Sequence, residues 1–182
     1  MITTTQAQEF VSLLKSLRAV RQFTDRPLPA EAVRDIQEVI RWSGSASNRQ
    51  EFQVLWVEDR AVLRRLAELK GYARHLAGAA AGAVIVSGIT PSSAATTRMN
   101  SDVLNAFDEG RIAERIMLAA HAHGIGSSIG MFVGDGCEKA AKLLGLAAGR
   151  AVRTTVSLGY PAEGAQRGGR RRPLDEVVKR IG

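Results

Sequence analysis

Cysteine is almost absent from this sequence, because Cys137 is the only one among 182 residues. An internal disulfide and a metal site built from several cysteines are therefore excluded. So little cysteine is typical of proteins that work in a reducing compartment, and we expect a cytoplasmic protein.

Histidine is also scarce, with only His75, His121 and His123 in the chain. The last two are two positions apart in a predicted helix and therefore point to different faces. No carboxylate stands beside them at the spacing of a metal site. The Gly-x-Ser-x-Gly motif of hydrolases is missing, and Cys137 has no partner in the sequence for nucleophilic catalysis. We expect neither a bound metal nor hydrolase chemistry.

Long apolar runs are missing as well. The most apolar stretch, residues 76–89, is too short to span a membrane and is interrupted by glycine. Residues 1–10 are polar and lack the apolar segment of a signal peptide. We therefore expect no membrane partner.

Acidic residues are outnumbered by basic ones, 18 against 25, which gives a net charge of +7. This balance fits an anionic partner as well as an ordinary solvated surface. A nucleic-acid-binding face would need a longer basic surface with exposed aromatic side chains, and aromatic residues make up only 5% of the chain. A nucleic-acid-binding module is therefore the weaker alternative, and we expect no nucleic-acid partner.

What the sequence does contain is the composition of one globular domain spanning 1–182, with 45% hydrophobic and 24% charged residues. Its patterns predict helices over 3–17, 29–42, 59–69, 102–123 and 136–144 and a terminal helix from 173. They predict strands over 52–57, 83–87 and 152–158, and the segment 124–130 leads into one more short strand. The polar segment 91–101 is predicted to be a loop. Strands and helices do not alternate regularly, which indicates an α+β fold with a mixed sheet of four or five strands surrounded by helices.

The helix predicted over 102–123 is apolar on nearly every side between Ile112 and Ala120. Such a helix is buried in a core or in a subunit interface, and the pattern leaves both open. The glycines that follow it, Gly124, Gly126 and Gly130, lie after a helix and before a strand. A dinucleotide-binding fingerprint has the opposite context, so a helix end followed by a tight strand explains them better.

The sequence contains two groups of arginines, and each group is compatible with binding an anion or with a purely structural role. The cluster 170–172 fits a phosphate clamp, because guanidinium groups form paired hydrogen bonds with phosphate oxygens. It fits equally a charged loop before a helix. Arg18 and Arg21 close the first predicted helix, where positive charge suits the helix dipole, and they could also face an anionic ligand.

Four segments in order along the chain carry a more specific signal. They are 17–23 with the proline turn after it, the small-residue loop 42–50, the helix and glycine turn 107–126, and 157–161 with the basic block 171–174. Each segment alone is a weak signal, whereas their order and spacing together are specific. Together they resemble the FMN-dependent nitroreductase family over nearly the whole chain.

This resemblance implies a largely antiparallel sheet in an intertwined homodimer, with FMN at the subunit interface. It also implies a ping-pong cycle, in which NAD(P)H reduces FMN and the reduced flavin then reduces a small-molecule acceptor such as a nitroaromatic or a quinone. NADH and NADPH are not distinguished. Because the cofactor carries the chemistry, no catalytic residue is expected to stand out. From its polarity and position, and not from the resemblance, the segment 91–101 is expected to cover the substrate pocket.

The resemblance further implies which residues bind FMN. Arg18 and the cluster 170–172 would hold the phosphate, and Arg21 would lie near flavin N1 and O2, where it would stabilise the reduced flavin. The loop 45–48 would come from the other subunit, and the segment 129–131 would line one face of the ring. The predicted FMN-binding residues are Arg18, Ala19, Arg21, Ser45, Ala46, Ser47, Asn48, Ile129, Gly130, Met131, Arg170, Arg171 and Arg172.

Three departures from the family pattern accompany this match. Leu17 and Ala19 stand where the family has an arginine and a serine that usually help to hold the flavin, and Glu51-Phe52 stands where it usually has Pro-Trp. A non-catalytic or weakly flavin-binding relative therefore remains an alternative to an active oxidoreductase.

Overall fold

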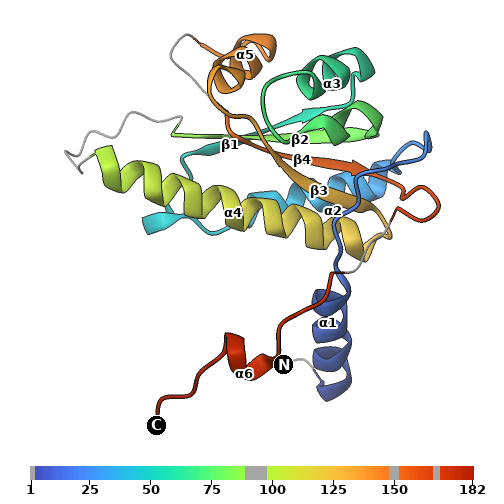
Figure 1. The fold of residues 1–182 in the computed structure, drawn as a ribbon, viewed down its shortest axis with the longest axis vertical. Coiled ribbons are helices and arrows are strands. Elements are labelled where there is room, and N and C mark those ends of the chain that lie inside the picture. The colour runs from blue at the N-terminus through green and yellow to red at the C-terminus, as the bar shows by residue number, and fades with distance from the viewer. Residues whose placement is uncertain (1–2, 89–97, 148–151, 166–168) are drawn as a thin grey trace.

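The computed structural model describes residues 3–88, 98–147, 152–165 and 169–182, with the backbone alone for 98–102. Its helices are α1 (Thr4–Ser16), α2 (Ala30–Arg41), α3 (Arg60–Ala67), α4 (Arg98–Ala122), α5 (Asp135–Leu143) and α6 (Leu174–Val177), with short 3-10 turns η1 (Ala46–Asn48) and η2 (Arg74–Gly78). Its strands are β1 (Phe52–Val57), β2 (Ala81–Ser87), β3 (Gly126–Met131) and β4 (Thr154–Gly159). The sheet lies between α3 and α5 on one side and α2 and α4 on the other (Figure 1).

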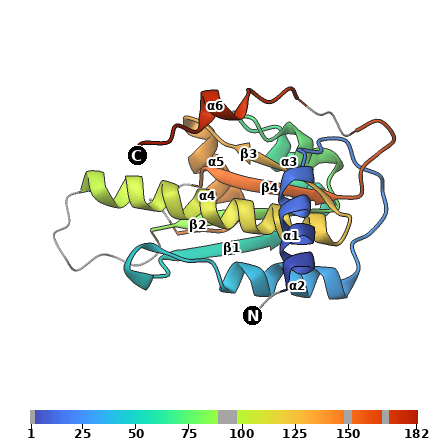
Figure 2. The same ribbon diagram turned by 90° about the horizontal axis from the view of Figure 1, so that it is seen from below.

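The strand order is β1-β2-β4-β3, and every neighbouring pair is antiparallel. The central strand β2 is buried on both faces, which explains why its sequence reads as an apolar run. Ala83 and Ile85 pack toward α2 and α4, whereas Val84 and Val86 pack toward α3 and α5. Alternation along one strand therefore divides the core into two layers. Seen from below, α2 and α4 lie across one face of the sheet (Figure 2).

These observations confirm the predicted α+β class with a largely antiparallel sheet. The sheet has four strands, and the parallel contact among the described residues is an isolated bridge between Ala19 and Ser127. The apolar helix α4 is buried in the core through Ile112, Ile116 and Ala120. Among the described residues, no helix combines the length and the apolar character that a membrane span requires.

The glycine turn after α4 has the role that the sequence predicts. Gly124 adopts a positive φ of 69°, which is the usual way for glycine to end a helix. At Gly126, a Cβ atom would lie only 2.8 Å from Cβ of Val20, so glycine allows the segment 17–23 to approach β3 closely. Neither residue belongs to a phosphate-binding loop.

Several element boundaries differ from the prediction, among them the starts of β2 at Ala81 and of β4 at Thr154, and two differences are larger. Helix α4 begins at Arg98, so the predicted loop 91–101 is helical in its described part, and residues 91–97 lie outside the described residues. Polarity alone does not break a helix, and Arg98 and Met99 are good helix formers. The terminal helix starts after Pro173 as expected but is only α6, four residues long.

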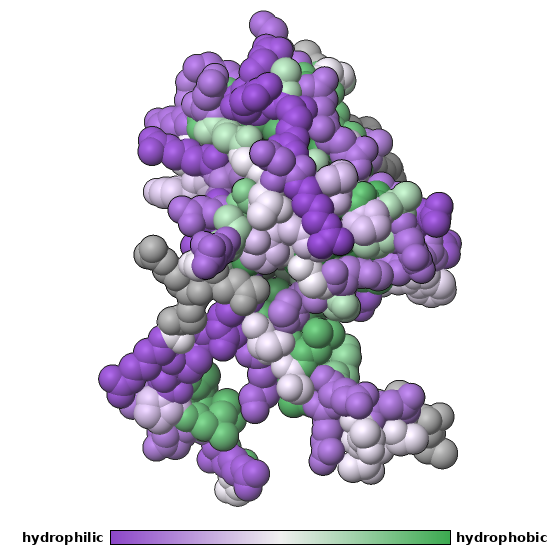
Figure 3. All heavy atoms as spheres, turned by 90° about the vertical axis from the view of Figure 1, so that its right-hand side faces the viewer, coloured by the Kyte–Doolittle hydropathy of each residue, from purple (hydrophilic) through white to green (hydrophobic). Residues whose placement is uncertain are grey.

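Two parts of the chain extend away from the body on the side of α4 (Figure 1). Helix α1 has no buried residue, although Phe10, Val11 and Leu14 lie on it with large exposed apolar side chains. Leu174 and Val177 of α6 are similarly exposed. Figure 3 shows apolar surface on these projecting parts, in its lower half. We call α1 and the segment 169–182 the two arms.

Candidate functional site

The candidate site lies at the outer edge of β3, the last strand of the sheet. Two segments cover this edge in part. The N–H of Val20 donates to the carbonyl of Ser127 (2.8 Å), and the N–H of Tyr72 donates to the carbonyl of Met131 (2.6 Å). Ile129 lies midway between them, and alternate residues of a strand direct their backbone groups to the same edge. The N–H and C=O of Ile129 therefore point into the gap between the two covering segments.

An open cavity of about 770 Å³ occupies this gap, and we call it the Arg21 cavity. Its lining comes from three separate parts of the chain: Arg21, Gln22, Gly71, Tyr72, Arg74, His75 and Ile129. A smaller cavity of about 280 Å³ adjoins it and is lined by Ala19, Arg21, Gln22 and Ala165. The Ile129 side chain is 44% exposed, so the site combines an uncovered apolar surface with a cation.

His75 is the titratable residue most strongly shaped by this site. Its Nδ1 lies 2.7 Å from the Ser157 hydroxyl, and its Nε2 is buried without a hydrogen-bond partner. Burial lowers the pKa of His75 below the ordinary value of 6.5, the charge of Arg21 lowers this pKa further, and the carbonyls of Tyr72 and Ile129 oppose the change. His75 is therefore neutral at pH 7, and Arg21 carries the positive charge.

Three of the predicted site residues meet here. Ala19, Arg21 and Ile129 line the two adjoining cavities. Met131 lies two positions farther along β3 and is exposed, whereas Gly130 is buried, with Cε1 of His75 only 3.1 Å from the position of an added Cβ.

The remaining predicted phosphate ligands do not line these cavities. The Arg18 guanidinium donates to the carbonyls of Lys15 and Leu17, each at 2.8 Å, and so closes the end of α1. Residues 170–172 are fully exposed, and Arg171 donates to the carbonyl of Gly169 (3.3 Å). In the single chain these arginines make no phosphate clamp, and their role in binding FMN stays a prediction.

The loop 45–48 lies far from the Arg21 cavity, beside the N-terminal half of α4 (Figure 1). The N–H of Ala46 donates to the buried carboxylate of Asp108 (3.2 Å), which ties the loop to α4. Ser47 and Asn48 both have positive φ, at 52° and 53°, so the turn is tight. No residue of this loop lines the Arg21 cavity.

Sequence reasoning missed Gly71, Tyr72, Arg74 and His75. No motif marks them, because they reach the site only through pairing of the segment 70–72 with the end of β3, where Val133 N–H also donates to the Lys70 carbonyl (3.0 Å). Among the described residues, no three His, Cys, Asp or Glu side chains gather closely enough to hold a metal ion. His121 and His123 point to different partners, Ser16 and Asp35.

Comparisons with known proteins agree with this geometry. The Nitroreductase family matches residues 14–72, which contain Arg21 and one side of the Arg21 cavity. A protein of Archaeoglobus fulgidus named as an NADH dehydrogenase/NAD(P)H nitroreductase is 28% identical over 158 residues, covering 86% of this chain and 87% of the relative.

Solved structures share the whole fold. NfrA2 of B. megaterium superimposes with a TM-score of 0.83 at 20% identity, over 96% of this chain and 74% of that one. An FMN-dependent nitroreductase of Clostridium difficile gives a TM-score of 0.78 at 20% identity, over 94% and 99% of the two chains. This α+β chain, which has a cavity at the edge of its sheet, therefore has the nitroreductase fold. Its resemblance to the nitroreductase family is confirmed.

Proposed function

We propose that this chain binds FMN and acts as an NAD(P)H-dependent oxidoreductase that reduces small acceptors such as nitroaromatics or quinones in a ping-pong cycle. The observation that carries the proposal is the meeting of Arg21 and Ile129 in one open cavity at the edge of β3. Both residues are among those that the family resemblance implies, and they lie more than a hundred positions apart in the sequence. The named activities of the relative and of the C. difficile protein support the same reading.

The residues present fit a flavin. An isoalloxazine ring needs an apolar surface, which the exposed side chain of Ile129 offers, and polar groups at its edge. The outward backbone N–H of Ile129 is such a donor for flavin N5. Arg21 supplies a cation near the position where the ring gains negative charge on reduction, and the small Ala19 leaves room beside it.

FMN, when bound, supplies the redox chemistry, since it accepts a hydride from a nicotinamide and gives electrons to an acceptor. The protein residues orient it and adjust the local charge. Arg21 stabilises an anionic ring by a fixed positive charge that costs no rearrangement during the reaction. His75 stays neutral and held by Ser157, so it adds shape to the cavity without adding a second charge.

We further propose that the working form is a homodimer. No residue of the loop 45–48 lines the Arg21 cavity, and the loop lies at the other end of α4 from the segment that joins α1 to α2 (Figure 1). We therefore infer that a second copy supplies this loop. The exposed apolar side chains of the two arms are what an interface would cover. In such a dimer Arg18 and the cluster 170–172 could bind the phosphate from positions that one chain alone does not offer.

The first experiment is an absorbance spectrum of the purified protein, followed by titration of the apoprotein with FMN and by NAD(P)H oxidation assays. We expect flavin absorbance and turnover with a nitroaromatic or quinone acceptor. Arg21→Ala should weaken FMN binding roughly tenfold or more, because it removes a charged hydrogen-bonding partner. Arg34→Ala, an exposed arginine of α2 outside the cavities, is the matched control.

Other outcomes would change the conclusion. Protein that binds no FMN at all would contradict the proposed cofactor site. Protein that binds FMN but oxidises no NAD(P)H with any acceptor would be the non-catalytic relative that Leu17 and Ala19 leave open.

A further inference from the structure

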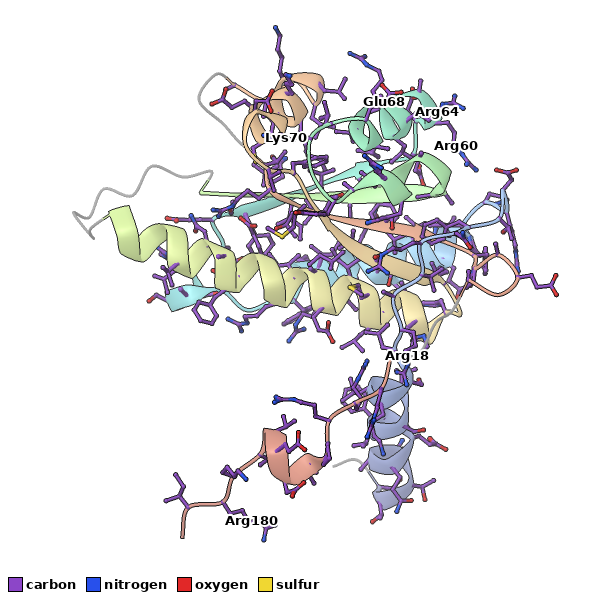
Figure 4. The ribbon with its side chains drawn as sticks, viewed as in Figure 1. Arg18, Arg60, Arg64, Glu68, Lys70 and Arg180 are labelled. Atoms are coloured by element: carbon purple, nitrogen blue, oxygen red, sulfur yellow. The ribbon has the colours of Figure 1, made fainter. Side chains whose placement is uncertain are left out.

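A further cavity adjoins the Arg21 cavity on the α3 side. It measures about 700 Å³, and its polar lining consists of Arg64, Glu68, Lys70 and Arg74. Gly71 and Arg74 line both cavities and therefore form their common wall. We call it the Arg64 cavity. Figure 4 shows Arg64 and Glu68 projecting from α3 and Lys70 lying after this helix, on the side of α5.

The common wall is fixed by the backbone. Gly71 has a φ of 150°, and an added Cβ would lie 2.1 Å from the Met131 carbonyl oxygen. The flanking hydrogen bonds from Tyr72 to Met131 and from Val133 to Lys70 hold this segment against β3. The two cavities therefore keep a constant spacing, and a ligand longer than a flavin can extend from one into the other past Arg74.

The Arg64 cavity has an excess of positive charge. It contains three cations, Arg64, Lys70 and Arg74, against the single carboxylate of Glu68. Other arginines of the described chain form ion pairs, such as Arg41 with Glu38 and Arg153 with Glu109.

The cations of the Arg64 cavity have no such partner among the described residues. Asp135 forms its ion pair with Lys139 (2.7 Å), and the charge of Lys70 reaches it only as a smaller influence that lowers the pKa of Asp135. This concentration of unpaired positive charge is therefore available to an anion.

We propose that the Arg64 cavity binds the 2′-phosphate of the electron donor and makes NADPH the preferred donor over NADH. This inference rests on the proposed function. With the nicotinamide in the Arg21 cavity, the adenosine end of the dinucleotide passes the Gly71–Arg74 wall. NADPH and NADH differ only in the 2′-phosphate, which carries between one and two negative charges near pH 7. Guanidinium groups bind such a phosphate through paired hydrogen bonds.

The kinetic test compares kcat/KM for NADPH and NADH in the flavin-loaded enzyme. The wild type should prefer NADPH by roughly tenfold or more, and Arg64→Ala should reduce this ratio about tenfold, mainly by raising KM for NADPH. Arg65→Ala is the matched control, because it removes the same charge from the neighbouring exposed position of α3, which does not line the cavity. A wild type that prefers NADH, or an Arg64→Ala variant that loses both donors equally, would overturn the proposal.

A binding measurement keeps the inference separate from the redox activity. Calorimetric titration with adenosine 2′,5′-bisphosphate and with adenosine 5′-monophosphate needs no turnover. We expect the bisphosphate to bind more tightly, Lys70→Ala to weaken its binding and Glu68→Gln to strengthen it, because this change removes the opposing charge. Equal affinities for the two nucleotides would contradict the phosphate site even if the protein proves to be an active flavoenzyme. A protein that binds no flavin but binds the bisphosphate more tightly than the monophosphate would refute the proposed function and leave the phosphate site standing.

Discussion

At the scale of single residues, two basic side chains of the Arg21 cavity, Arg21 and His75, differ in their burial and therefore in their charge. Arg21 is exposed and stays charged, whereas burial and the neighbouring Arg21 charge lower the pKa of His75. Ser157 holds the ring through Nδ1, and Gly130 gives it room on the strand. A neutral imidazole packed against the sheet is therefore part of the structure that supports the cavity.

The lowered pKa of His75 predicts that acid destabilises the protein. Below the ordinary value of 6.5 the unfolded chain takes up a proton at this residue that the folded chain does not, so the free energy of unfolding should fall as the pH decreases. Urea unfolding between about pH 8 and about pH 5 measures this slope, and His75→Asn should make it shallower. Identical slopes for the two proteins would show that His75 does not contribute.

The sequence identifies the site residues unevenly. Arg21 lies in the segment 17–23 that resembles the family, and Ile129 follows the matching helix and glycine turn closely enough for the resemblance to imply it. Gly71 and His75 cannot be found in this way, because their place depends on which backbone segment pairs with the end of β3. Arg18 is a third case. Its sequence position is compatible with binding an anionic ligand and with closing the end of α1, and in the single chain it closes the helix.

At the scale of elements, local signals define most starts and ends. Asp59 begins α3 by accepting hydrogen bonds from the N–H groups of Ala61 (2.7 Å) and Val62 (3.0 Å), as its position before an apolar pattern predicts. The strand β1 has the predicted bounds because its residues have high β propensity. The start of α4 was missed because the polar segment 91–101 lacks the apolar periodicity from which a helix is predicted.

The cap of α3 allows a quantitative prediction. Asp59→Ala should lower the free energy of unfolding by about 1 kcal/mol, because two N–H groups of the first turn lose their acceptor. Asp25→Ala is the control, since it breaks only the exposed ion pair with Arg60 (3.5 Å) and should cost less than about 0.5 kcal/mol. Urea unfolding at neutral pH measures the free energy of unfolding of both variants. Equal losses in the two variants would mean that the Asp59 cap does not stabilise the protein.

At the scale of the whole molecule, the body and the two arms differ in how they bury apolar surface. The body places its apolar residues on both faces of the sheet, whereas α1 has no buried residue. A 13-residue helix that buries none of its residues is marginal in water, so α1 needs a further surface to bind. The sequence predicts that α1 is helical, but it does not identify the surface against which the apolar side chains of α1 pack. That surface need not belong to the same chain.

The proposed dimer therefore predicts that α1 controls the oligomeric state. Phe10→Glu should shift the protein toward the monomer, because it introduces a charge into the apolar surface that the partner would cover. Gln8→Glu introduces the same charge at an exposed polar position of the same helix and should leave the dimer intact. Sedimentation velocity distinguishes the two states. A wild type that sediments as a monomer would contradict the proposed assembly.

The partly covered edge of β3 has a consequence for solubility. An exposed sheet edge invites association with the strands of other molecules, and proteins prevent this by shielding the edge. Here the segments ending at Val20 and beginning at Gly71 occupy both ends of the strand and leave only the backbone around Ile129 accessible. That opening is too short for a foreign strand to form a ladder, yet it is wide enough for the rim of a flat small molecule. The same arrangement thus shields the sheet edge from association and keeps the proposed binding position open.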